Sequence, residues 1–336
     1  MDIVKFISVA VMVFIHAHIV LVTDYYAIID TSGFFYNVTS RFMFIGLFIT
    51  ILPMLAGYVF RMNNDYGLRK TIKLAAALSL LGFFMNMITW GAGYTFSWNI
   101  LQLVSLSLVV IAVLMRFFSV YGVLLLGLFT IFGAEFLRSY LAVSGDNYLI
   151  SIFTGADDHF VFWPFFPWFG VVSLGFLFAD YQLKYKNSAP FRMSAMIGGM
   201  LLVAVAFFRG EISPYLDHYY VWSPSIFQPE IGFVLATIGL FLVLAVLGNS
   251  FFNKVRLHKY GIINSYSKGI LWIYIVQMFV SYKLSFLMKK FFPMDEPSAA
   301  YFVFIIFMLG LSWLVGVLSI RLLQEKKMVI LLRKIR

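Results

Sequence analysis

Long apolar runs separated by short polar stretches dominate the chain. The clearest runs cover residues 3–23, 42–60, 193–208, 231–247 and 299–320. Each approaches or exceeds the roughly 20 residues that an α-helix needs to cross the ~30 Å hydrocarbon core of a membrane. The pattern predicts an all-α, polytopic integral membrane protein of about ten transmembrane helices in a single domain over residues 1–336. We expect the helices near residues 3–23, 41–60, 70–90, 98–115, 119–138, 161–180, 192–208, 231–249, 268–288 and 299–321.

Composition supports the membrane assignment. Hydrophobic residues make up 62% of the chain and charged residues 12%, against roughly a quarter charged in a soluble domain. The first run is longer than the apolar part of a signal peptide and lacks a basic start and a small-x-small exit, so we expect a retained first helix. The polar stretch over residues 133–162 leaves room for a re-entrant segment.

Charged residues sort by loop. The even-numbered loops and the C-terminal tail are basic, whereas the odd-numbered loops hold most of the acidic residues. The positive-inside rule then places the even loops and both chain ends in the cytoplasm, in a protein that we expect in the bacterial inner membrane. The net charge of +10 would suggest nucleic acid as partner of a soluble protein. Here it indicates loops that face anionic membrane lipid.

Several kinds of chemistry are excluded by what the sequence lacks. Cysteine is absent, which rules out disulfides, thiolate zinc sites, iron–sulfur clusters and cysteine nucleophiles. The five histidines are scattered, so we expect no metal site. The sequence contains no Walker loop, dinucleotide fingerprint or Gly-x-Ser-x-Gly elbow, which argues against an ATP-driven pump.

The first predicted helix carries ionisable residues inside an apolar run. His16 follows Lys5 by eleven residues, or about three turns, so both lie on one face, with Asp2 on nearly the same stripe. His16 would lie ~20 Å from the inner end of the helix, in the outer half of the bilayer. An imidazole at that depth indicates function, because it can accept a proton from a hydroxyl or amine near neutral pH. A histidine hydrogen-bonded between helices is the alternative, and His18 points away from this face.

Five groups of short motifs follow one another along the chain. They are Asp2-x-x-Lys5 with Phe14-Ile15-His16, Arg41-Phe42-Met43-Phe44 with Leu55-Ala56-Gly57-Tyr58, the stretch from Trp98 to Ser107, Phe165-Phe166-Pro167-Trp168-Phe169-Gly170 with Leu174-Gly175, and Ile273-Tyr274-Ile275-Val276-Gln277. In this order they resemble the transmembrane acyltransferase superfamily, which includes the heparan-α-glucosaminide N-acetyltransferase-like and acyltransferase-3-like integral membrane proteins. The chain departs from the family pattern at Lys5, Ile270 and Gln277, where Arg, Ser and His are common.

The resemblance implies an acyltransferase that moves an acyl group, usually acetyl from acetyl-CoA, to a sugar, polysaccharide or glycolipid on the outer side of the membrane. His16 would be the general base, with Lys5 and Asp2 as its polar support. The residues expected to bind the acceptor are Arg41, Trp98, Asn99, Gln102, Asp158, His159 and Gln277. The residues expected to pair with the phosphates of CoA are Arg61, Arg69, Lys70 and Lys73.

Most of these site assignments have a structural alternative. The basic residues also fit ordinary topology charge, and Arg41 fits an interfacial side chain that reaches toward water. Asn99 and Gln102 share a helical face, which would serve hydrogen bonds between helices equally well. Trp98 also suits the aromatic belt at a membrane interface, and the Asp158–His159 pair also suits a solvated loop.

Two other classes of function remain open from the sequence. One is a transporter or flippase for a lipid-linked saccharide, which Pro53 and the turn at Gly91 and Gly93 would suit. The other is a catalytically silent assembly subunit. Binding of acyl-CoA separates an acyltransferase from a flippase. A homodimer is compatible with all three classes.

Overall fold

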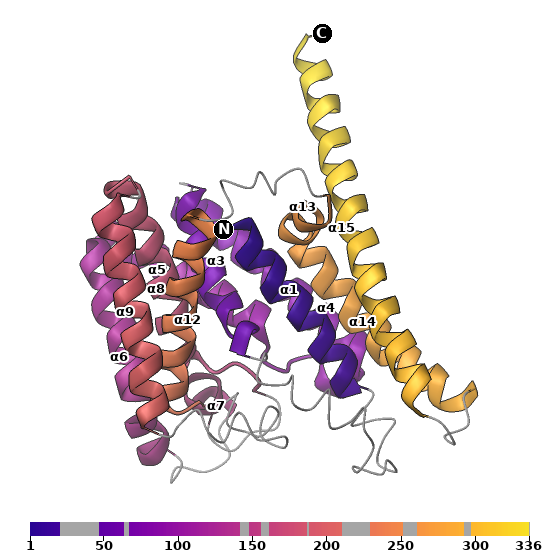
Figure 1. Ribbon diagram of the computed structural model, residues 1–336, viewed down its shortest axis with the longest axis horizontal. Coiled ribbons are helices and arrows are strands. Elements are labelled where there is room, and N and C mark those ends of the chain that lie inside the picture. The colour runs from indigo at the N-terminus through magenta and orange to yellow at the C-terminus, as the bar shows by residue number, and fades with distance from the viewer. Residues whose placement is uncertain are drawn as a thin grey trace. The chain divides into compact units, whose positions relative to one another are not determined.

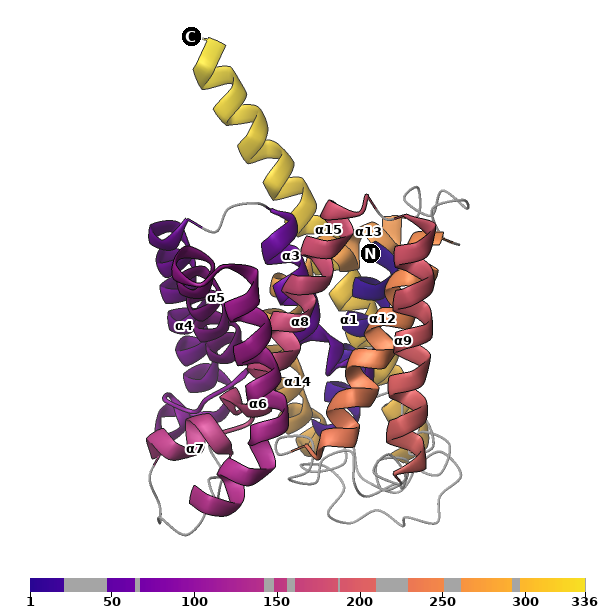
Figure 2. The same ribbon diagram turned by 90° about the vertical axis from the view of Figure 1, so that its left-hand side faces the viewer.

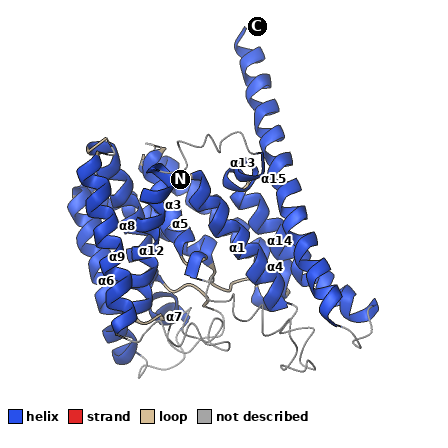
Figure 3. Ribbon diagram, viewed as in Figure 1, coloured by secondary structure: helices blue, strands red, loops and turns tan. Residues whose placement is uncertain are grey.

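The computed structural model describes residues 1–20, 47–63, 67–141, 148–155, 161–186, 188–209, 229–250, 261–291 and 297–335. These residues form α-helices and a short 3-10 helix, and no strand occurs in this part of the chain (Figure 3). The elements are α1 (Asp2–Val20), α3 (Ile51–Met62), α4 (Leu68–Trp90), η3 (Ala92–Tyr94), α5 (Ile100–Phe117), α6 (Ser119–Leu141), α7 (Tyr148–Thr154), α8 (Phe165–Lys184), α9 (Ala189–Phe208), α12 (Ile231–Ser250), α13 (Gly261–Lys268), α14 (Ile270–Phe291) and α15 (Pro297–Ile335). The all-α prediction is confirmed.

Among the described residues, six helices are long and apolar enough to cross a membrane. They are α4, α5, α6, α9, residues Ile231–Gly248 of α12 and residues Val303–Leu322 of α15. Two shorter apolar helices, Ile51–Met62 and Ile270–Leu284, accompany them. The chain is an integral membrane protein, as its apolar runs predict. The total of about ten spans and the cytoplasmic location of both ends stay predictions.

Some helix boundaries differ from the sequence-based expectation. α15 continues to Ile335, fourteen residues beyond the predicted end at 321. The added stretch holds four Leu and three Lys and has no Gly or Pro, so nothing in it breaks the helix. The stretch over residues 133–162 contains the short helix α7, and the predicted helix at 41–60 appears as α3, which begins at Ile51. Residues 41–46 lie outside the described residues.

The chain divides into two compact units. Unit 1 comprises Met1–Ile49 and Leu247–Arg336, so its described helices are mainly α1, α13, α14 and α15. Unit 2 comprises Thr50–Val246 and holds α3 to α9 and nearly all of α12. The prediction of one functional domain over the whole chain stays a prediction.

Unit 2 is built on helices that approach one another closely. A Cβ atom added to Gly57 of α3 would collide with the carbonyl oxygen of Val172 in α8, and one added to Gly175 of α8 would collide with that of Met54 in α3. Small residues at such positions let two membrane helices pack backbone to backbone. α9 and α12 also lie side by side in this unit (Figure 2). Large apolar side chains, among them Phe169 of α8, fill the remaining core.

Unit 1 packs α1 against α13, α14 and α15 (Figure 1). The break between α13 and α14 falls at Gly269, where an added Cβ would lie 2.7 Å from the Cα of Gly316 in α15. Tyr266 of α13 donates a hydrogen bond of 2.7 Å to the carbonyl oxygen of Leu309 in α15. Burial raises the pKa of Tyr266 to about 12, so the phenol remains a donor at any physiological pH. Its ring also meets Phe6 of α1 edge to face at 5.4 Å. These contacts hold α13 and the start of α14 against α15, and α13 against α1.

Candidate functional site

The first candidate site lies in unit 1, where α1 meets α14. Gln277 Nε2 lies 2.8 Å from His16 Nδ1, although the two residues are 261 positions apart in the chain. His16 comes fourteen residues after Asp2, which places it ~21 Å along α1, and Gln277 lies ~10 Å into α14. Sequence reasoning singled out both residues but had no means to pair them. We call this contact the His16–Gln277 pair.

The residues that neighbour His16 along α1 are apolar. Val13, Ile15 and Ala17 are fully buried on α1, and Gln277 is 1% exposed. Gln277 Oε1 has no hydrogen-bond partner among the residues that the structure describes. A buried amide oxygen left without a donor costs ~1–3 kcal/mol of folding stability. Packing alone therefore does not explain why a glutamine occupies this position.

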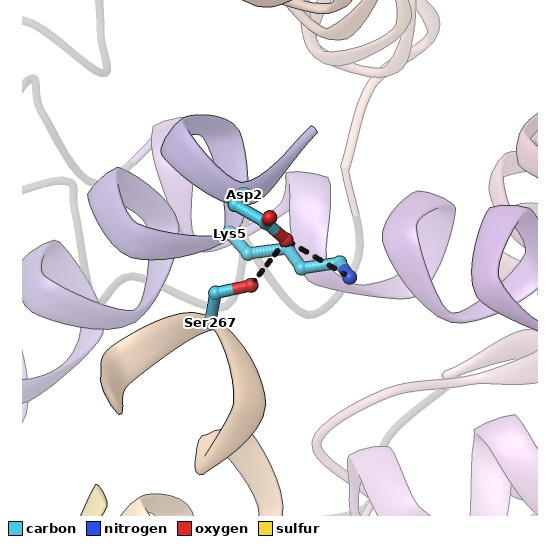
Figure 4. A network of polar contacts seen from close by, with 3 residues as sticks. All are labelled: Asp2, Lys5 and Ser267. Carbon is cyan, nitrogen blue, oxygen red and sulfur yellow. Dashed lines mark hydrogen bonds and ion pairs between the residues drawn. The ribbon is translucent and has the colours of Figure 1, made fainter. Parts of the chain in front are cut away.

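A second polar contact lies at the start of α1 (Figure 4). Ser267 of α13 donates a hydrogen bond of 2.6 Å to Asp2 Oδ1, and the same oxygen lies 3.8 Å from Lys5 Nζ. The carboxylate thereby holds α1 to α13, and its place in the first turn also suits the positive end of the helix dipole. Ser267 was missed by sequence reasoning, which had only its place in a polar stretch before an apolar helix to find it.

Asp2 and Lys5 lie far from the imidazole. Lys5 precedes His16 by eleven residues, which corresponds to ~17 Å along the helix axis. At that distance Asp2 and Lys5 can affect His16 only indirectly, by changing the position of α1. Their predicted part in catalysis stays a prediction.

A third polar group lies in unit 2 between α4 and α5. Asn99 Nδ2 donates to Asn86 Oδ1 at 2.6 Å, and Asn86 Nδ2 donates to the carbonyl oxygen of Ser97 at 2.5 Å. Asn99 also caps α5, because its Oδ1 accepts from the backbone N–H of Leu101 at 2.8 Å. Gln102 completes the capping box by accepting from the backbone N–H of Asn99 at 3.2 Å. We call Asn86, Asn99 and Gln102 the amide cluster.

The amide cluster is used mainly for structure. Gln102 Nε2 is buried without a partner among the described residues. It packs against Gly82 of α4, where an added Cβ atom would lie only 2.6 Å from it. Asn86 was missed by sequence reasoning, and its only signal was a lone amide in an apolar helix. The expected contact of Asn99 and Gln102 with an acceptor stays a prediction.

Trp98 precedes the cap of α5 and is tied to the chain before α8. Its indole Nε1 donates a hydrogen bond of 2.8 Å to the carbonyl oxygen of Trp163. The Trp163 ring packs on Trp168 with ring centroids 4.7 Å apart. This arrangement gives unit 2 a group of indoles at one end of its helices, and the predicted contact of Trp98 with a sugar stays a prediction.

The basic residues expected to bind CoA fall into two kinds. Arg61 Nε forms an ion pair of 2.7 Å with Asp180 Oδ1 of α8, and its guanidinium also faces the Phe176 ring. Arg69, Lys70 and Lys73 are exposed in the first two turns of α4. Cations at the positive end of a helix dipole are unfavourable by themselves, so these three side chains form a place where an anion would be stabilising. Their assignment to CoA stays a prediction.

Three predicted site residues, Arg41, Asp158 and His159, lie outside the described residues. Within the part that the structure describes, no three residues of the metal-ligating kinds come together. His16 places an imidazole, which has one donor and one acceptor nitrogen in its neutral form, inside the apolar helix α1.

Fold and site together define an integral membrane protein with a histidine held inside its helices. The family described as heparan-alpha-glucosaminide N-acetyltransferase, catalytic, matches residues 1–220 of the 336. The chain belongs to this family of membrane acetyltransferases, which confirms the resemblance found in its motifs. The match includes His16 and the amide cluster, whereas Ser267 and Gln277 lie beyond it. No curated protein and no solved structure is significantly similar to the chain.

Proposed function

We propose that the protein transfers an acetyl group from cytoplasmic acetyl-CoA to an amino or hydroxyl group of a sugar on the outer side of a bacterial inner membrane. Membership of this family supports acetyl transfer, and the glucosaminide in the family's description supports a glucosamine-like acceptor. A surface polysaccharide or a glycolipid would present such a sugar at the membrane. The basic loops support a cytoplasmic donor side.

The observation that carries the proposal is the His16–Gln277 pair. A polar residue inside a membrane helix is costly and usually functional. Here the Gln277 amide contacts Nδ1 of the imidazole at 2.8 Å. The other ring nitrogen, Nε2, would act as the base when the proton of the neutral ring is on Nδ1. An oriented histidine is the usual general base for acyl transfer.

The reaction balances with one base. The acceptor nitrogen or oxygen attacks the acetyl carbonyl carbon while His16 Nε2 takes the acceptor's proton. The carbon–sulfur bond then breaks, and the proton passes from His16 to the CoA sulfur. A route through an acetyl-histidine intermediate uses the same imidazole as the nucleophile.

Donor and acceptor binding are assigned to separate groups. Arg69, Lys70 and Lys73 at the start of α4 would pair with the phosphates of acetyl-CoA. Arg61 has a lesser part because Asp180 already takes one edge of its guanidinium. Arg41, Trp98, Asp158 and His159 would contact the sugar, and the indole of Trp98 is suited to stack on it.

The test is acetyl transfer by purified protein. Wild type and His16→Gln are incubated in detergent with radiolabelled acetyl-CoA and a panel of amino and hydroxy sugars. We expect label on a sugar with wild type and a loss of at least a hundredfold with the variant. His18→Gln is the matched control, since it removes the other imidazole of α1, two residues further along the chain.

Each outcome has a definite meaning. Transfer that survives in His16→Gln would retain the acetyltransferase and refute His16 as its base. Failure of wild type to bind or consume acetyl-CoA would refute the proposed reaction and favour a flippase for a lipid-linked saccharide.

A further inference from the structure

Gln277 presents both a donor and an acceptor to a histidine that has two neutral forms. Its amide Nε2 faces His16 Nδ1 at 2.8 Å, and its Oε1 is buried without a partner among the described residues. Turning the amide by 180° exchanges the two atoms at nearly unchanged shape. The pair therefore has two hydrogen-bonded arrangements at one position.

The two arrangements differ in which ring nitrogen carries the proton. When the amide N–H donates to Nδ1, the proton of the neutral ring sits on Nε2, which then cannot accept another. When Oε1 faces the ring, Nδ1–H donates to it, and Nε2 keeps its lone pair. Only the second arrangement makes Nε2 a base, and it also keeps its hydrogen bond after the ring becomes an imidazolium.

Among the described residues, the helices that pack on α1 bring no carboxylate that would replace Gln277 in this role. α13 and α14 contain neither Asp nor Glu, and Glu325 of α15 follows the span that ends at Leu322. On α1 itself Asp2 is engaged with Ser267 at the far end. The other titratable groups of α1 and these helices whose side chains are described are Lys5, His16 itself, Tyr266, Lys268, Tyr274, Tyr282, Lys283 and Arg321. The contact of Gln277 with Nδ1 is thus made by a neutral amide and not by a carboxylate.

We propose that Gln277 is a positioning residue which selects the ring nitrogen used by His16, its amide turning with the tautomer of the imidazole. In the reactive arrangement Oε1 accepts from Nδ1–H, Nε2 takes the proton of the acceptor, and the same nitrogen returns it to the CoA sulfur. The inference rests on the proposed function of His16 and adds a role different from acceptor binding, which the motif alone implied for Gln277.

The experiment combines a pH profile with nitrogen NMR. Gln277→Glu offers an acceptor with a negative charge, and Gln277→Met removes the hydrogen bond at similar size. We expect Gln277→Glu to move the acid limb of kcat/KM upward by about one pH unit or more, because a nearby carboxylate favours the imidazolium. We expect Gln277→Met to lower kcat about tenfold with little change in KM for the acceptor.

The NMR arm needs no activity. In protein labelled with nitrogen-15 at its five histidines, His16→Gln identifies the signals of His16. We expect wild type to show both neutral tautomers in exchange and Gln277→Glu to shift the population to the form protonated at Nδ1. Ser281→Ala is the matched control, because Ser281 is also buried on α14, one turn beyond Gln277.

The outcomes separate the two proposals. If both Gln277 variants leave the tautomers and the acid limb as in wild type, the role of Gln277 is refuted. A rise in KM for the acceptor with an unchanged acid limb would make Gln277 a substrate-binding residue instead. A tautomer shift in a protein that transfers no acetyl group would retain the positioning role and refute the proposed function.

Discussion

The His16–Gln277 pair of unit 1 and the amide cluster of unit 2 are both polar contacts between apolar helices, but they differ in the groups that they contain. Both place polar side chains between apolar helices, and each leaves one amide atom without a described partner, Gln277 Oε1 and Gln102 Nε2. The amide cluster contains no titratable group, and its contacts serve a helix cap. The His16–Gln277 pair contains an imidazole and caps nothing. Buried polarity therefore does not by itself mark a catalytic site, and the proposed role of the His16–Gln277 pair depends on its imidazole.

The largest expected effect separates the two regions by activity. His16→Gln should lower kcat by about a hundredfold to ten-thousandfold, the usual worth of a general base. Its stability should stay close to wild type, because glutamine can still hydrogen-bond the amide of Gln277. Initial rates and thermal unfolding in detergent measure the two quantities. Unfolding at a much lower temperature would mean that His16 is chiefly a structural residue.

The next effect is the reverse, a loss of stability without a loss of rate. Asn99→Ala removes the cap of α5 and the hydrogen bond to Asn86, which together should cost ~2 kcal/mol of unfolding free energy. kcat per folded molecule should change less than about twofold, since no proton is moved by this cluster. Asn99→Ser is the matched control, because serine restores the cap but not the reach to Asn86. A tenfold fall in kcat with intact stability would turn the amide cluster into a substrate site.

The two sites also show which features of the protein could be predicted from its sequence and which could not. The apolar runs predict the helices well, because the length of a span is a local property. The motifs predict the family and single out His16, Gln277, Asn99 and Gln102. The pairing of His16 with Gln277 is set by the packing of α1 on α14 across 261 positions, and no local pattern encodes it. Asn86 and Ser267 escaped for the same reason, since their partners, Asn99 and Asp2, are chosen by tertiary contacts.

A third prediction concerns the affinity for acetyl-CoA at the basic start of α4, in addition to the rate and stability effects above. Lys73→Gln, in the exposed basic start of α4, should raise KM for acetyl-CoA about fivefold, corresponding to ~1 kcal/mol for one screened contact with a phosphate. The effect should shrink as salt is added, and kcat should not change. Lys186→Gln removes another exposed cation of unit 2 as the control. Equal KM values for the two variants would leave the start of α4 as topology charge.

The smallest effect tests whether unit 1 acts through contact or through position. Asp2→Asn keeps an oxygen for the hydroxyl of Ser267 and removes the ion pair with Lys5, whose atoms lie 3.8 Å apart. The two side chains are 37% and 18% exposed, so the pair should be worth ~0.2–1 kcal/mol of stability. kcat should fall less than about twofold, because α1 remains fastened to α13. A fall of tenfold or more with an unchanged unfolding temperature would instead assign the Asp2 carboxylate itself to the reaction, across ~21 Å from His16.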